Sequence, residues 1–207
     1  MLTGTMDVLL SVCAGLGLAA ACGFRVFVPL LVAALAARGG YLHPSAGMEW
    51  LASWPATIAF GSATLLEIAG YYIPWFDHAL DTIASPAAVV AGTVAAAGAF
   101  GEMHPALKWS AALIAGGGLA AGVQGTTVVT RALSTATTAG AGNPIVSTIE
   151  AVCAVVVSVL AVVVPILAVI LVLIVLAVLL RWILRRRRQR ENAGPLGDQL
   201  PASPPAG

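Results

Sequence analysis

Charged residues are scarce in this 207-residue sequence. Asp, Glu, Lys and Arg together make up 9% of the chain and aromatic residues 6%, whereas hydrophobic residues make up 59% and the mean hydropathy is +0.96. A soluble globular domain carries about 25% charged residues, so this composition excludes that class. We therefore predict an integral membrane protein whose all-α, polytopic domain covers residues 1–184.

Signals for secretion, metal binding and catalysis are also missing. No lysine or arginine precedes the first apolar run, which argues against a cleaved signal peptide. The cysteines are odd in number and the histidines form no HExxH pair; these residues are Cys13, Cys22, Cys153, His43, His78 and His104. We predict no metal site, no cofactor and no enzymatic activity, because a catalytic site needs its reacting groups within reach of one another.

Half of the basic residues lie in one cluster after the last apolar run. Five of the ten are Arg185, Arg186, Arg187, Arg188 and Arg190. The positive-inside rule predicts a cytoplasmic C-terminus in a bacterial inner membrane, and the cluster can also bind anionic lipid headgroups. Nucleic acid is not an expected partner, because no aromatic platform accompanies the arginines. Residues 185–207 are predicted to form a basic tail that is proline-rich and disordered from Asn192 onward.

A single carboxylate interrupts the apolar run that precedes Pro74. A charged side chain near the bilayer centre costs roughly 2.5–3.5 kcal/mol, so Glu67 must be neutral, hydrated or paired. Its neighbours three and four residues away on a helix are small or polar, namely Ala63, Thr64, Gly70 and Tyr71. This helix face is predicted to point toward protein rather than lipid.

The first apolar block, Val8 to Ala37, is too long for one straight span. Its length corresponds to about 45 Å of helix, whereas the hydrocarbon core is about 30 Å thick. Gly23, Arg25 and Pro29 fall within two turns of one another. We predict that the helix breaks at Gly23.

An arginine follows each of two similar glycine-rich segments. Residues 14–21 align without gaps on residues 115–122, and the arginines are Arg25 and Arg131. An acid then follows in corresponding runs, as Glu67 and Glu150. Such matching broken segments are typical of carriers built from internal repeats.

The repeat leads to a prediction of topology. The two halves would be residues 6–100 and 107–184, related as inverted repeats. Three crossings per half, six in all, follow if the broken first segment counts as one crossing. Four crossings per half, with parallel repeats, is the alternative.

Four further polar residues are candidates for binding an ion or solute. Asp77 and Asp81 lie four residues apart, either on a solvated loop helix or at an entry site for a cation or proton. Gln124 and Asn143 are expected to supply uncharged hydrogen bonds. Residues 134–144 are interpreted equally as a re-entrant, cavity-lining connection or as an aqueous loop.

Three motifs carry a family resemblance. GFRVFVPLL at 23–31, EIAGYYIPWFD at 67–77 and NPIVSTIEA at 143–151 together resemble the bacterial membrane-protein family known as the domain of unknown function 4126 family. The resemblance implies a middle motif E-x-x-A-D-K-I-P-x-x-D, in which Tyr71 and Tyr72 stand here at the D-K positions. It also implies an acidic pair at the end of the last motif, where Glu150 is followed here by alanine. The resemblance implies the membrane fold but no established activity.

The paired charges favour a small pseudo-symmetric transporter or channel for an ion or small solute. Glu67 and Glu150 would respond to protons or cations, and Arg25 and Arg131 would neutralise them or hold an anionic substrate. Structural roles are the alternatives. Glu67 would pair with Arg25, while the preferred interpretations are helix capping for Glu150 and snorkelling to the interface for Arg131.

A second class of function is a non-transporting assembly or scaffold protein. Its small-residue helix faces would pack against partner helices, and a homo-oligomer is one such assembly. In that case the charged residues would serve folding and association, not solute flux.

Overall fold

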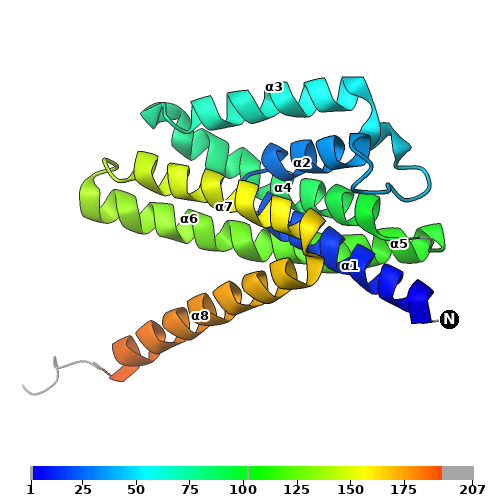
Figure 1. Cartoon of the computed structure of the whole chain (residues 1–207). Helices are drawn as coiled ribbons and strands as arrows, with labels where there is room; N and C mark the ends of the chain where they lie inside the picture. The colour runs from blue at the N-terminus through cyan, green and yellow to red at the C-terminus, as the bar shows by residue number, and fades with distance from the viewer. Residues whose placement is uncertain (1, 102, 193–207) are drawn as a thin grey trace, which may run out of the picture. The chain divides into compact units, whose positions relative to one another are not determined.

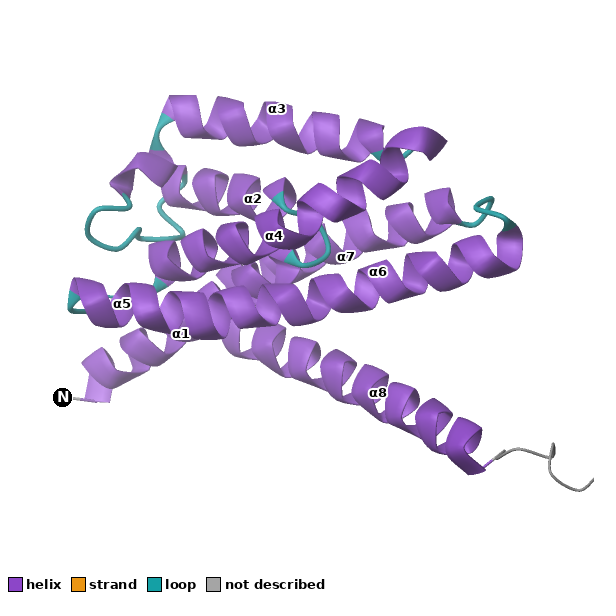
Figure 2. Cartoon of the chain, turned by 180° about the vertical axis from the view of Figure 1, so that it is seen from behind, coloured by secondary structure: helices purple, strands orange, loops and turns teal. Residues whose placement is uncertain are grey.

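The structure is a computed structural model that describes residues 2–101 and 103–192, and every element in it is a helix (Figure 1, Figure 2). The elements are α1 (Leu2–Cys22), α2 (Phe27–Arg38), the 3₁₀ helix η1 (Glu49–Ala52), α3 (Trp54–Gly70), α4 (Pro74–Ala99), α5 (Pro105–Ala111), the π-helical turn η2 (Ala112–Gly117), α6 (Gly118–Thr138), α7 (Asn143–Val163) and α8 (Pro165–Asn192). No strand occurs in this part of the chain, which confirms the all-α prediction.

Three helices are long and apolar enough to cross a membrane. They contain the segments Thr82–Ala99, Pro105–Thr138 and Asn143–Val163. Shorter apolar helices cover Met6–Cys22, Phe27–Arg38 and Pro165–Ile174. Because a helix needs about 20 apolar residues to span the hydrocarbon core, the chain is a membrane protein.

The chain divides into two compact units, Met1–Val172 and Leu173–Gly207. Helix α8 runs from the first unit into the second and continues through Asn192, so it includes the basic cluster. Among the side chains of that cluster, the one of Arg185 is described, and it is exposed. The predicted disordered segment after Asn192 lies outside the described residues.

Helices α1 and α2 form a hairpin that enters and leaves at the same end of the first unit. A methyl group at Gly15 would lie 2.8 Å from the ring of Phe100, at the C-terminal end of α4. Beyond α2, the hydroxyl of Ser45 donates to Ala97 O at 2.6 Å and its amide to Gly98 O at 2.9 Å. Both arms of the hairpin therefore reach the same end of α4, and α2 turns back beside α1 (Figure 1).

The hairpin differs from the predicted single broken crossing of the first apolar block. Helix α2 has 12 residues, which correspond to about 18 Å, well short of a hydrocarbon core of about 30 Å. The chain reverses at residues 23–26, which we call the hairpin tip. The tip packs between α3, α6 and α7, so the non-helical backbone is surrounded by protein.

Helix α4 joins two segments that we had interpreted from the sequence as separate elements. The residues around Asp77, interpreted as a loop helix, and the apolar run after Pro86 belong to one 26-residue helix. Pro86 lacks an amide hydrogen and yet leaves the helix continuous. The alanine face of α4 (Ala84, Ala88, Ala91, Ala95 and Ala99) is buried in one cluster with α1 and α2, and this packing holds the helix together.

Helices α5, η2 and α6 form one long helical segment that crosses α4 closely. A methyl group at Gly116 would lie 2.5 Å from the Cβ of Ala96 and 2.8 Å from Gly92 O, so the two helices approach to backbone contact. The segment reaches Thr138, and α7 already begins at Asn143. The polar residues 134–144 are therefore the last turn of α6, a tight turn and the start of α7, and not a re-entrant connection.

Candidate functional site

The hairpin tip requires a residue without a side chain where it meets α6. A methyl group at Gly23 would lie 2.5 Å from the Cβ of Val123 and 2.6 Å from Ala120 O. Because the backbone comes this close, the chain can turn inside the bundle instead of at its surface. The next charged residue, Arg25, is thereby buried, with 1% of its surface exposed.

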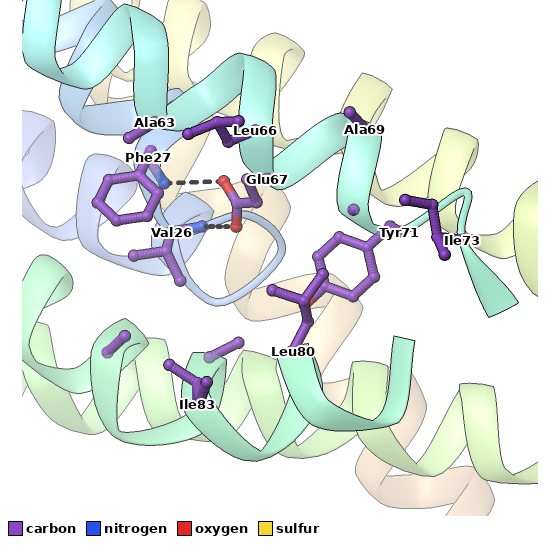
Figure 3. A pocket seen from close by; sticks show the side chains of 13 residues that line it. Val26, Phe27, Ala63, Leu66, Glu67, Ala69, Tyr71, Ile73, Leu80 and Ile83 are labelled. Atoms are coloured by element: carbon purple, nitrogen blue, oxygen red, sulfur yellow. Dashed lines mark hydrogen bonds between the residues drawn. The ribbon is translucent and has the colours of Figure 1, made fainter. Parts of the chain in front are cut away.

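Glu67 holds the amide end of α2. Its Oε1 accepts from the amide of Val26 at 2.7 Å and its Oε2 from the amide of Phe27 at 3.1 Å (Figure 3). The first amides of a helix have no partner within the helix, and in a membrane no bulk water replaces it. A carboxylate from α3 fills this role and also suits the positive end of the helix dipole. This contact explains why an acid is tolerated in α3.

Arg25 reaches from the hairpin tip to α7. Its Nη2 donates to Ser147 O at 2.8 Å and to the Ser147 hydroxyl, and lies 3.9 Å from Glu150 Oε2. Its Nε and Nη1 are buried and have no hydrogen-bond partner among the described residues. The guanidinium group is therefore anchored through Nη2, and two of its donor nitrogens make no hydrogen bond to the described residues.

Arg131 and Glu150 form the strongest ion pair of the site. Arg131 Nε lies 3.1 and 3.2 Å from the two carboxylate oxygens, and Nη2 donates to Oε2. Both residues are buried, with exposed fractions of 3% and 5%. Arg131 does not snorkel to the interface, and Glu150 does not cap α7, because it lies two turns inside that helix. Both preferred structural alternatives are wrong.

Tyr71 connects the two arginines. Its ring centroid lies 3.9 Å from the guanidinium carbon of Arg25 and 3.9 Å from that of Arg131. At 5% exposure the ring is shielded from solvent, where such cation–π contacts are strongest. Tyr71 follows the last residue of α3 and lies four residues after Glu67. The C-terminal end of α3 therefore supplies two groups of the site.

These contacts define the charged cluster, which consists of Arg25, Glu67, Tyr71, Arg131 and Glu150. Two formal positive charges balance two negative charges, as a low-dielectric interior requires. The predicted pairing of Glu67 with Arg25 is replaced by a different arrangement, in which Glu67 binds α2 and Glu150 is close to both arginines. The two arginines and two glutamates that the sequence singled out are brought together.

Two members of the site were not candidates from the sequence. Tyr71 appeared as a helical neighbour of Glu67 and at a D-K position of the family motif but not as a site residue, and Ser147 was not considered. Ser147 lies three residues before Glu150, so the same helix-face rule would have placed it beside that acid.

Gln124 and Asn143, two further predicted site residues, are not members of the charged cluster. Gln124 is buried on α6, with 4% of its surface exposed. The Asn143 side chain donates to the Thr135 hydroxyl at 3.1 Å and serves the turn between α6 and α7. The side chains of Asp77 and Asp81 lie outside the described part of the structure.

A pocket of about 530 Å³ lies beside the charged cluster. Its walls come from the hairpin tip, the second half of α3 and residues 80–87 of α4 (Figure 3). Glu67 and Tyr71 line its inner side, and Leu66, Ile73 and Ile83 lie on its outer side. Among the lining residues, Glu67 is the one that carries a charge.

The fold defines a polytopic helical membrane protein, and its interior holds a buried cluster of charged residues. The family described as Domain of unknown function (DUF4126) matches residues 12–186, and the chain belongs to this family. No curated protein and no solved structure matches the chain.

Proposed function

We propose that this protein is a small transporter or channel for an ion or small solute, with the charged cluster as its site. One observation carries the proposal. The tip of a hairpin whose second helix, α2, is too short to span the bilayer places Arg25 inside the bundle, where its guanidinium group meets the Tyr71 ring, Ser147 and Glu150. Irregular backbone at membrane depth is tolerated where it is buried in protein or lines a cavity, and in carriers such backbone forms substrate sites.

Arg25 is the group we assign to solute binding. Its Nη2 is held by Ser147, but two further nitrogens, Nε and Nη1, have no hydrogen-bond partner among the described residues. A guanidinium offers its donors in a planar fork that suits carboxylate and other oxyanions. The favoured solute is therefore an anion, or a solute with an anionic group.

Glu67 is the group we assign to coupling. Its two oxygens tie α3 to the amides of Val26 and Phe27, so the carboxylate fixes the position of the hairpin tip. A proton or cation on Glu67 would weaken these two contacts and free the tip to move. The binding of a proton or cation at Glu67 is thus linked to the position of Arg25 through the backbone of Val26 and Phe27.

Solute flux into proteoliposomes tests the proposal. The purified chain is reconstituted and assayed with a panel of inorganic ions and small carboxylates, alongside Arg25→Ala and Glu67→Gln. We expect flux above that of empty vesicles for at least one solute, with strong loss in Arg25→Ala. Arg38→Ala is the matched control, because Arg38 is exposed and stacks on Trp54, outside the charged cluster.

An unchanged flux in Arg25→Ala would contradict the assigned role of that residue. Absence of flux for every solute, from protein that elutes as a single species, would contradict transport as such. The folding of each variant is followed by its thermal unfolding in detergent.

A second candidate function is an assembly scaffold, and a specific feature of α6 favours it. Gly118, Gly122 and Gly125 are exposed, and a methyl group at any of them would meet no atom within 4 Å. Gly118 and Gly122 form a G-x-x-x-G pair, the spacing by which membrane helices approach each other closely. This face would pack against a second copy of the chain.

Cross-linking in membranes tests the scaffold. Gly122→Leu leaves the interior of the chain untouched, so we expect normal folding and loss of the cross-linked dimer. Ala59→Leu, at an exposed position of α3, is the control. A dimer that survives Gly118→Leu combined with Gly122→Leu would contradict an interface on this face.

We further propose a bacterial inner-membrane location with a cytoplasmic C-terminus and no enzymatic activity. The basic cluster at the end of α8 supports this orientation, since positive residues remain on the cytoplasmic side and attract anionic headgroups. A reporter fused after residue 207 that is active only in the periplasm would contradict the orientation.

A further inference from the structure

The pocket beside the charged cluster has apolar walls for a structural reason. Its one charged lining residue, Glu67, turns both carboxylate oxygens toward the amides of Val26 and Phe27 (Figure 3). The ring of Tyr71 is engaged by two guanidinium groups. The carboxylate oxygens of Glu67 are thus used within the protein, and apart from the Tyr71 hydroxyl the side chains of the remaining lining are aliphatic or aromatic. A buried water needs two to four polar partners, which such walls do not offer.

The pocket opens toward lipid. Leu66, Ile73 and Ile83 line it and are exposed by 74%, 51% and 65%. The outer face of α3 continues as an apolar surface through Ile58 and Leu65, and Ile83 lies in a membrane-spanning segment of α4. In a membrane protein such a surface contacts acyl chains, so the opening is continuous with the bilayer.

We propose that this pocket is a binding site for one acyl chain of a bilayer phospholipid, which enters between α3 and α4. Its volume of about 530 Å³ lies in the range of specific ligand sites, about 300–1,000 Å³. An acyl chain satisfies the apolar walls and is the neighbouring molecule at the opening. The inner end of the chain would rest against the α3 face that carries Glu67, so the lipid supports the contact between Glu67 and the hairpin tip. The site does not depend on transport.

Photo-labelling with a phospholipid tests the site. The full chain is reconstituted in phosphatidylcholine vesicles with a trace of phosphatidylcholine that carries a diazirine in mid-chain, and the labelled residues are mapped by mass spectrometry. We expect label on Ala84, which lines the pocket and is 8% exposed, as well as on Val152, which is 57% exposed on α7 and reports ordinary lipid contact. Label on Val152 without label on Ala84 would overturn the proposal.

Filling the pocket gives a second readout. Ala87→Trp and Ala63→Leu add bulk to the lining, and we expect loss of label at Ala84 with label at Val152 unchanged. Ala59→Trp, on α3 outside the pocket lining, is the control and should keep both labels. Persistence of the Ala84 label in both filled variants would overturn the proposal.

A diazirine fatty acid in the same vesicles distinguishes the source of the chain. Labelling of Ala84 by the free acid and not by the phospholipid would overturn the assignment to a bilayer phospholipid. Loss of flux with normal labelling, or the reverse, separates this site from the proposed transport.

Discussion

Arg25 and Glu150 lie 3.9 Å apart, yet each makes its hydrogen bonds elsewhere. Arg25 donates to Ser147, and Glu150 accepts from Arg131. The Glu150 carboxylate therefore stabilises Arg131 through hydrogen bonds and Arg25 through electrostatic attraction across 3.9 Å. When one carboxylate lies between two guanidinium groups, the loss of any of the three should lower the stability of the protein, because a charge without a partner in the protein interior is costly.

The Arg131–Glu150 pair should show strong energetic coupling. We expect Arg131→Met to lower the free energy of unfolding by about 3–5 kcal/mol, because it leaves Glu150 without its main partner. The double variant Arg131→Met with Glu150→Leu should lose less than the sum of the single variants. Unfolding in mixed micelles measures this cycle, and additive losses would show that the two side chains do not interact.

Glu67 should contribute to folding through the amides of α2. Glu67→Gln keeps one acceptor oxygen but places an amide donor opposite the second N–H group. We expect a loss of about 1–3 kcal/mol in the free energy of unfolding. Glu49→Gln is the control, since Glu49 is exposed in η1 and water can replace its contact with the Gly47 amide. Equal unfolding curves for wild type and Glu67→Gln would refute the capping role.

Hydropathy and helix periodicity were sufficient for the all-α membrane fold and for the inward-facing side of α3. They could not predict which groups the buried charged side chains contact. Glu67 binds amides some 40 residues earlier in the chain, and this contact exists only because α2 turns back. A break signal such as glycine marks where a helix can end but not the direction in which the next helix leaves. The internal repeat stays a prediction, and the two acids it equates have different partners here.

Arg131 shows a second limit of the sequence. The sequence favoured snorkelling of Arg131 to the interface. In the structure α6 continues for seven residues beyond Arg131, to Thr138, so the arginine lies inside the helix rather than at its end. Helix ends set by tertiary packing are not visible in local composition.

Tyr71 should stabilise the site through its ring. Tyr71→Leu removes two cation–π contacts, and we expect a loss of about 2 kcal/mol in the free energy of unfolding. Tyr71→Phe keeps the ring and should retain more of the stability than Tyr71→Leu. Thermal unfolding of the two variants side by side measures the difference. An equal loss in both would assign the effect to the hydroxyl.

Gly23 should tolerate no side chain. A methyl group there would lie 2.5 Å from Val123 Cβ and 2.6 Å from Ala120 O, and a backbone atom cannot move aside easily. We expect Gly23→Ala to cost about 1–3 kcal/mol in the free energy of unfolding. Gly61→Ala is the matched control, because its nearest neighbour, Leu31 Cδ1, lies at 3.8 Å. A neutral Gly23→Ala would mean that the tip does not touch α6.

The hairpin predicts a membrane topology that differs from the six crossings expected from the sequence repeat. If α1 and α2 enter and leave on one side and α3 and α4 each cross once, the N-terminus and the loop between residues 101 and 105 share a side of the membrane. The segment from α5 to α6 has 34 residues, about 51 Å, and crosses once, so the turn at residues 139–142 lies on the other side.

Short tags at these three places, labelled with a membrane-impermeant reagent before and after permeabilisation, measure the topology. We expect the tag at the N-terminus and the tag in the 101–105 loop to behave alike, and the tag in the 139–142 turn to behave oppositely. Every tag should react after permeabilisation, which controls for burial. Opposite behaviour of the first two tags would require an odd number of crossings before residue 101. The hairpin would then be a crossing, and Arg25 would no longer sit at a turn inside the membrane.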